Sequence, residues 1–238
     1  MKLRIDKMLS NIGLGSRKQI KQDAREGHIK VNDITEKDSS RIIDTDTDDV
    51  KYKGEIVKYV KYIYLMMNKP KGVISATEDK YDKTVIDLLK DEDKSYNPFP
   101  VGRLDKDTEG LLILTNDGQL AHNLLSPKKH VDKTYYAEVE EEVTEDDAKA
   151  FEQGVILTNE NYRTLPAKLE IIEAGYPSSC YVTIKEGKFH QVKRMFNAVN
   201  NEVIYLKRLS MGPIKLDSRL KLGEYRHLTE KEVSILIK

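Results

Sequence analysis

Asp105 lies in a short polar segment, residues 102–110, directly before a dense apolar run at residues 111–114. A carboxylate in a loop that a rigid scaffold holds can act as a nucleophile or as a general base. Residues 115–118 are Thr, Asn, Asp and Gly, which predicts a turn that starts a helix. Because an Asp-rich loop is also typical of a solvated turn or a helix cap, spacing alone leaves both interpretations open.

The segments on either side of Asp105 alternate between apolar runs typical of strands and periodicities typical of helices. Strands outnumber regular strand–helix alternations, which favours an α+β fold with a mixed, mainly antiparallel sheet over a doubly wound fold. The expected strands cover residues 63–67, 111–115, 135–139, 169–172, 180–184 and 203–209. The expected helices cover residues 84–89, 119–125, 144–153, 191–199 and 229–237, of which those at Thr144 and Thr229 begin with a capping pattern.

The N-terminal region predicts a small, locally basic domain. Apolar spacing between residues 4 and 29 suits two short helices with Ser16 as the N-cap of the second, followed by a strand at residues 29–33. Residues 1–32 hold eight basic residues against three acidic ones, whereas residues 33–49 are acidic. Four basic residues would lie on one flank of the second helix, which by itself is also typical of a solvated helix face: Arg17, Lys18, Lys21 and Arg25.

Length and composition bound the remaining possibilities. The 238 residues have room for one medium domain and one small one, and we expect the junction within residues 54–62, between domains at residues 1–59 and 60–238. The net charge is zero, so local basic patches must attract any polyanionic partner. The single cysteine, Cys180, excludes an internal disulfide and a Cys-based metal cluster. Without a signal-length or membrane-spanning apolar run, we expect a cytoplasmic protein.

The polar segment at Asp105 resembles a known motif. Gly102-Arg103-Leu104-Asp105 followed by residues 108–112 resembles the catalytic-aspartate motif of the RsuA-type rRNA pseudouridine synthases. Three further segments resemble other motifs of that family in the family's order, namely residues 68–73, 133–135 and 186–195, the last continuing at residues 203–212. At the N-terminus, residues 4–9, 15–18 and 27–32 resemble the landmarks of an S4-type RNA-binding domain, with Asp33 where a glycine often follows. The resemblance covers essentially the whole chain.

This resemblance implies isomerisation of a uridine to pseudouridine, with Asp105 as the catalytic carboxylate acting on a flipped-out nucleotide. Tyr135 is then expected against the target base, with Leu206 packing on the base from another side. Arg103 would displace the base. A basic residue of the third motif, Lys193 in preference to Arg194, would lie beside Asp105 and favour its charged form. The residues expected to bind substrate or RNA also include Lys69 and, from the S4-type domain, Arg4, Lys7, Ser16, Arg17, Lys18 and Lys21.

The five histidines show no spacing suited to zinc, and we interpret His190 as a hydrogen-bonding residue at the start of a helix. The glycines at Gly13 and Gly15 lack the strand and third glycine of a nucleotide-binding loop. An isomerisation consumes nothing, and the resemblance implies neither a metal nor another cofactor.

Three interpretations of the partner remain open. The segment that includes Glu160 and Asn161, residues 166–170 and the compact C-terminus resemble the small-subunit (16S) rRNA branch more than the large-subunit (23S) branch, whose members often carry extended tails. The third alternative is a non-catalytic RNA-binding or ribosome-assembly protein. We expect a monomer that acts on ribosomal RNA, small-subunit rRNA or its assembly intermediate, without a membrane partner.

Overall fold

The computed structural model describes residues 1–157 and 162–237. The chain divides into two compact units, one formed by Met1–Ile63 with Lys90–Pro98 and the other by Tyr64–Leu89 with Phe99–Lys238. The division predicted from the sequence falls at residues 59 and 60, and no sequence signal separated the segment that contains α3 (Asp91–Lys94) from its neighbours.

The N-terminal unit packs two short helices against small antiparallel sheets. Ser16 caps the second helix by accepting a hydrogen bond from the Gln19 N–H at 3.2 Å, as predicted. Asn32 and Asp33 both have positive φ, 51° and 66°, so this Asp does adopt turn geometry in place of the usual glycine. The elements are β1 (Lys2–Arg4), α1 (Ile5–Asn11), α2 (Arg17–Arg25), β2 (Ile29–Val31), β3 (Ile34–Thr35), β4 (Ile42–Asp44), β5 (Val50–Tyr52) and β6 (Glu55–Val57). Strands β1 and β4 pair, and β3-β2-β5-β6 form the larger sheet.

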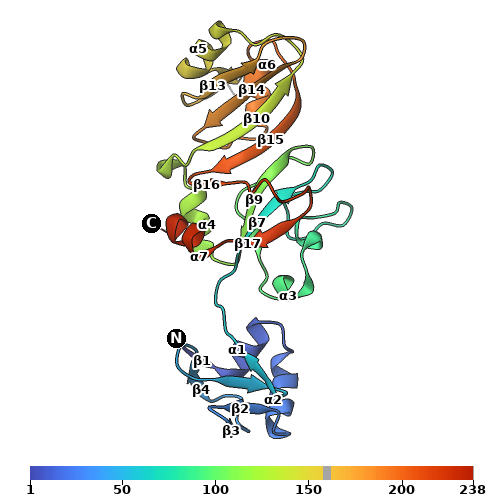
Figure 1. Cartoon of the computed structure of the whole chain (residues 1–238), viewed down its shortest axis with the longest axis vertical. Helices are drawn as coiled ribbons and strands as arrows, with labels where there is room; N and C mark the ends of the chain where they lie inside the picture. Colours follow the sequence, from blue (N-terminus) through green and yellow to red (C-terminus); the bar gives the residue numbers. More distant parts are fainter. Residues whose placement is uncertain (158–161, 238) are drawn as a thin grey trace. The chain divides into compact units, whose positions relative to one another are not determined.

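The C-terminal unit is built on one long mixed sheet with strand order β13-β14-β10-β15-β9-β7-β17 (Figure 1). The pairs along this order are antiparallel except β15 with β9, which confirms the mixed, mainly antiparallel sheet. The strands are β7 (Tyr64–Lys69), β8 (Phe99–Pro100), β9 (Glu109–Thr115), β10 (Lys133–Val139), β11 (Ile156–Leu157), β12 (Tyr162–Arg163), β13 (Lys168–Glu173), β14 (Ser178–Ile184), β15 (Val203–Met211), β16 (Ile214–Lys215) and β17 (Tyr225–His227).

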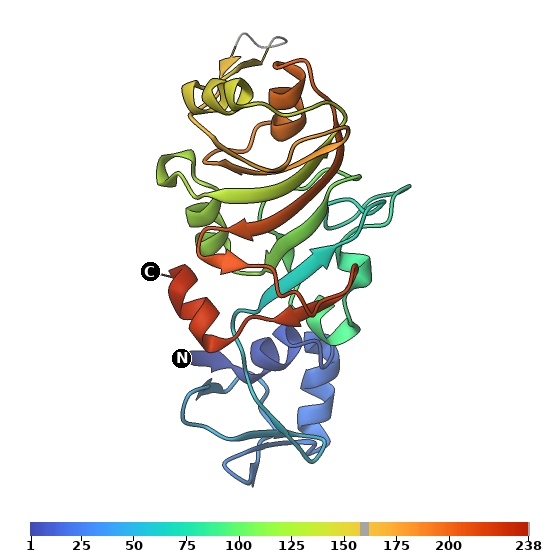
Figure 2. The ribbon, with the colours of Figure 1, turned by 45° about the horizontal axis from the view of Figure 1, so that its top comes forward.

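Two groups of helices cover different parts of this sheet (Figures 1 and 2). Helices α4 (Gly118–Leu125) and α7 (Glu230–Ile237) pack on β7 and β9 through a core that includes Met66, Ile113, Leu120, Leu124 and Leu236. Helices α5 (Glu145–Gln153) and α6 (Gln191–Asn197) lie beside β13, β14 and β10 and join through a ring contact of Phe151 with Phe196 at 5.1 Å.

Local signals predicted these elements well because each has a local cause. Strand β9 is buried at all seven positions, as a dense apolar run in a central strand requires. Both capping patterns form, since Thr144 and Thr229 each exchange hydrogen bonds with the acid three residues later. Apart from β2, the strands of two or three residues were not predicted, and neither was α3. The helix predicted at residues 84–89 is only a 3-10 turn, η1 (Ile86–Leu88). There the Asp87 carboxylate accepts hydrogen bonds from the Thr84 N–H and hydroxyl, and the turn ends after three residues.

Candidate active site

One cavity of the C-terminal unit brings together residues that lie far apart in the sequence. Arg103 and Asp105 come from the loop before β9, Tyr135 from β10 and Leu206 from β15. Pairing explains the arrangement, because Tyr135 faces Arg208 and Ala137 faces Leu206, so alternate residues of β10 and β15 point to one face of the sheet. The other lining residues are Gly102, Leu104, Thr108, Leu125, Lys133, Ile184, Gly187, Lys188, His190, Gln191, Val192 and Arg208.

Lys69 holds the backbone of the loop that carries Asp105. This ammonium is fully buried and donates to three backbone carbonyl oxygens, those of Asp105 at 3.0 Å, Thr108 at 2.9 Å and Pro70 at 3.1 Å. The three donors of the ammonium are thereby used inside the protein. The prediction that Lys69 contacts RNA is therefore corrected, since the side chain supports the backbone of the Asp105 loop. Burial lowers the pKa of Lys69 to about 8.

The neighbours of the Asp105 carboxylate differ from those expected. His190 brings its Nε2 to 3.5 Å from Oδ1 of Asp105, whereas Lys193 bonds both carboxylate oxygens of Asp107 at 2.6 Å. Arg194 donates from Nη1 to the Phe189 carbonyl at 3.3 Å. Although partial burial opposes it, the ion pair with Lys193 holds the pKa of Asp107 below its usual range.

His190 occupies the position predicted for it, at the start of α6, with a left-handed backbone, φ 48°. Its side chain does not cap the helix by a hydrogen bond. The imidazole instead faces Asp105, which the sequence did not indicate.

Two buried cations in the cavity wall were missed by the sequence reading. Arg208 is 2% exposed and donates from Nε to the Leu111 carbonyl at 2.8 Å, while its Nη2 has no hydrogen-bond partner within the described part of the chain. Lys133 is 8% exposed, donates to the Val131 carbonyl at 2.8 Å, and has a pKa that burial and the nearby Arg208 lower. The sequence signal that could have identified Arg208 was the period-2 spacing of a strand, which puts Arg208 on the same face of the sheet as Leu206.

These contacts give the cavity a definite chemistry. Tyr135 and Leu206, 7% and 5% exposed, provide flat and apolar walls. The Asp105 carboxylate, 27% exposed, remains accessible at the rim. Arg208 offers a donor in a dry wall, where a hydrogen bond is worth more than in water. The arrangement suits a flat ring with carbonyl groups, held beside a carboxylate that can react with it.

The predicted RNA-binding residues of the N-terminal unit lie at its surface. Lys7, Arg17, Lys18 and Lys21 are exposed, and Arg4 pairs with Asp6 at 2.7 Å. Ser16 is exposed as well, although its hydroxyl is used as the helix cap.

The described residues lack two further kinds of feature. They contain no group of three or more His, Cys, Asp or Glu side chains that could hold a metal ion. Residues 1–157 and 162–237 also include no helix with the length and apolar character needed to cross a membrane. Glu160 and Asn161, two of the residues that favoured the small-subunit branch, lie outside the described residues.

Comparison with known proteins relates the two units to two families. The family model described as RNA pseudouridylate synthase matches residues 63–198, and the S4 domain model matches residues 3–50. The uncharacterized RNA pseudouridine synthase YtzG of Bacillus subtilis (strain 168) is 52% identical over 235 residues, covering 98% of each chain. The ribosomal small subunit pseudouridine synthase A of Vibrio cholerae is 40% identical over 236 residues, covering 99% of this chain and 100% of that protein. A crystal structure of a pseudouridylate synthase matches with a TM-score of 0.69 and 36% identity, covering 98% of this chain and 99% of that one.

Proposed function

Because the chain belongs to the RNA pseudouridylate synthase family and carries an S4 domain, we propose that it converts a specific uridine of small-subunit ribosomal RNA to pseudouridine. The observation that carries the catalytic assignment is the shared cavity of Asp105, Arg103, Tyr135 and Leu206. The choice of RNA rests on the full-length similarity to a Vibrio cholerae protein that is named for the small subunit. An RNA substrate agrees with exposed basic residues on α2, which attract phosphates in a salt-dependent manner.

The reaction breaks the bond between uracil N1 and ribose C1′ and forms a bond between C5 and C1′. The C5 proton is lost and N1 gains a proton, so the reaction consumes nothing. The target base must first leave the RNA stack, which costs on the order of a few kcal/mol. The cavity then receives it between Tyr135 and Leu206, while Arg103 at the exposed rim helps hold the flipped state.

Asp105 supplies the reactive carboxylate, either as a nucleophile or as a base toward a ribose proton while the base is detached. Its backbone is fixed by Lys69, so the carboxylate is placed before the substrate arrives. His190, at 3.5 Å, is the side chain that would support its charge when protonated. Lys193 holds Asp107 on the same loop.

The test is site-resolved pseudouridine mapping of small- and large-subunit rRNA from cells with and without this gene. We expect one small-subunit site to disappear and to return with the wild-type protein. Asp105→Asn, which keeps the shape and removes the charge, should not restore it, because loss of a general base or nucleophile lowers rates at least about a hundredfold. Glu140→Gln, at an exposed carboxylate, should restore it fully.

Each other result has a definite meaning. Loss of a large-subunit site would keep the chemistry and change the target RNA. Pseudouridine that survives Asp105→Asn undiminished would refute the catalytic role of this residue. No loss at any rRNA site would favour a non-catalytic RNA-binding or assembly protein.

A further inference from the structure

A second cavity adjoins the catalytic one in the C-terminal unit. The two share four lining residues, Leu125, Lys133, Gly187 and Lys188, so they are separated by no more than a common wall. The second cavity extends away from Asp105, between the end of α4, the β12–β13 connection and the loop after β14. Its remaining lining residues are Ser126, Pro127, His130, Tyr162, Leu165, Lys185 and Glu186.

Part of the wall of this second cavity is apolar or aromatic. Leu125 lies in the shared wall and is 43% exposed, so its side chain is not needed to fill the protein core. Leu165 contributes a second aliphatic surface. The Tyr162 ring lies beneath the Lys188 ammonium, whose Nζ is 4.5 Å from the ring centroid. A flat base could pack on these groups as bases do on aromatic side chains of proteins that bind single-stranded RNA.

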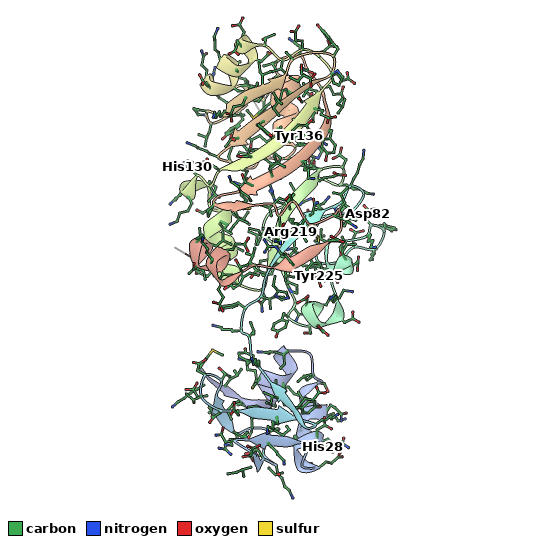
Figure 3. The ribbon with its side chains drawn as sticks, viewed as in Figure 1. His28, Asp82, His130, Tyr136, Arg219 and Tyr225 are labelled. Atoms are coloured by element: carbon green, nitrogen blue, oxygen red, sulfur yellow. The ribbon has the colours of Figure 1, made fainter. Side chains whose placement is uncertain are left out.

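Four exposed lysines belong to this region: Lys185 and Lys188 line the cavity, and Lys128 and Lys129 lie between the lining residues Pro127 and His130 in the sequence. Lys128 and Lys129 lie in η2 (Pro127–Lys129), and Lys185 and Lys188 in the loop after β14, all exposed. In the described part of the chain none of the four has an ion-pair partner, although the whole chain has zero net charge. His130, labelled in Figure 3, ends η2 with a left-handed backbone and lines the same cavity.

Two nearby acids, Glu186 and Asp132, offset only part of this charge. Glu186 lines the cavity and offsets one lysine, while its carboxylate accepts from the Tyr162 hydroxyl at 2.6 Å, the Gln191 amide at 2.7 Å and the Leu165 N–H at 3.0 Å. Asp132 is exposed on the approach to β10 and offsets one lysine at most. The opening therefore keeps a net positive charge, which suits phosphate groups.

We propose that this second cavity is a subsite for the nucleotide next to the target uridine in an unpaired RNA strand. Its base lies against Leu125, Leu165 and Tyr162, and its phosphates face the four lysines. The inference rests on the proposed function, because the shared wall lets a strand with one base in the catalytic cavity place the neighbouring base in the second one. Unpaired strands offer splayed bases and accessible phosphates together, which duplex RNA does not.

The experiment uses the full chain and a synthetic rRNA fragment that contains the mapped uridine, with an abasic ribose at either neighbouring position. We compare kcat/KM for the wild type and Leu165→Ala. For the wild type we expect one of the abasic substitutions to lower kcat/KM about tenfold, the effect of losing one stacked base. In Leu165→Ala the same substitution should cost less than about threefold, because the subsite is already impaired.

A second pair of variants tests the phosphate contacts without relying on Leu165. Lys185→Ala combined with Lys188→Ala should raise the Kd for the unmodified fragment about tenfold and reduce the slope of log Kd against log salt by about one to two. Lys221→Ala, at an exposed lysine that lines neither cavity, should leave both unchanged.

Equal abasic penalties in the wild type and Leu165→Ala, together with an unchanged salt slope in the lysine variant, would overturn the subsite. Pseudouridine formation by the wild type would still stand in that case. If the wild type modifies no rRNA fragment, the proposed function fails instead. In that case, the Kd values of the wild type and the variants for a small-subunit rRNA fragment decide whether the subsite binds RNA.

Discussion

Arg208 combines a buried position with a donor, Nη2, that has no partner among the residues which the structure describes. A carbonyl group of a bound substrate suits such a donor, because leaving a buried donor unsatisfied costs about 1–3 kcal/mol. The same side chain anchors β9 through the Leu111 carbonyl. It thus connects the sheet to the cavity.

We expect Arg208→Lys to lower kcat/KM for pseudouridine formation by about tenfold or more, since Lys keeps the charge but lacks the forked donors. Arg219→Lys, at an exposed arginine seen in Figure 3, is the matched control and should change little. Steady-state kinetics on the same rRNA fragment, with urea unfolding of each variant, measure the effect. Unaltered kinetics in Arg208→Lys would show that the guanidinium is only structural.

The buried ammonium of Lys69 makes stability depend on pH in a defined direction. Its pKa is about 8 in the folded protein and 10.5 as the ordinary value, so between these pH values the unfolded chain binds more protons. The contribution of this group to the free energy of unfolding therefore rises with pH across that window, by up to about 3 kcal/mol in total. Below the window the contribution does not change with pH.

Urea unfolding measures this effect at pH 7.5 and pH 10. The free energy of unfolding of the wild type, relative to that of Lys69→Met, should be higher at pH 10. Other titrating groups cancel in this difference because both proteins share them. The same pH dependence in both proteins would contradict the assignment. Lys69→Met should also slow pseudouridine formation at pH 7.5, because the Asp105 loop loses two hydrogen bonds, those to the Asp105 and Thr108 carbonyls.

At the scale of elements, the parallel contact of β9 with β15 fixes the end of the Asp105 loop. Gly110 pairs with Arg208 there and has φ 103°. A Cβ at this position would lie 2.2 Å from the Arg208 carbonyl oxygen, so no side chain fits without separating the strands. The close approach brings Arg208 and the loop into one cavity.

Gly110→Ala should lower the free energy of unfolding by about 3 kcal/mol or more, from a backbone clash added to backbone strain. Gly72→Ala is a matched control in the same unit, because its φ is 85° but a Cβ there meets nothing within 4 Å. It should cost only about 1–2 kcal/mol, the left-handed strain. Denaturant unfolding of the two variants gives the comparison, and equal losses would contradict the clash.

At the scale of the whole molecule, we propose that the N-terminal unit supplies affinity for RNA and that the C-terminal unit carries out the chemistry. We expect Arg17→Ala, Lys18→Ala and Lys21→Ala together to weaken rRNA binding, to reduce its salt dependence and to leave kcat at saturating RNA nearly unchanged. Lys37→Ala with Lys58→Ala, exposed in the same unit, is the control. A fall in kcat without a change in the Kd for RNA would contradict the assignment of RNA affinity to the N-terminal unit.

The sequence by itself determined the elements and the chemical inventory. Apolar periodicity, the caps at Ser16, Thr144 and Thr229, and the turn at residues 115–118 depend on neighbours in the chain, and they correctly predicted most helices and the strands of six or more residues. The motif order indicated the family before any geometry was known. The helix expected at residues 84–89 was wrong because the pattern did not anticipate that Asp87 would bond back to Thr84.

Only the tertiary structure decided the contacts within the site. Lys193 and Asp107 are separated by 86 residues, and no local pattern specifies which of two carboxylates on one loop a lysine from another element will reach. Burial of Lys69, the approach of His190 to Asp105 and the unpaired donor of Arg208 likewise depend on how β7, β15 and α6 meet around the loop. Such contacts follow from packing between distant segments, since side-chain reach and burial are properties of the assembled fold.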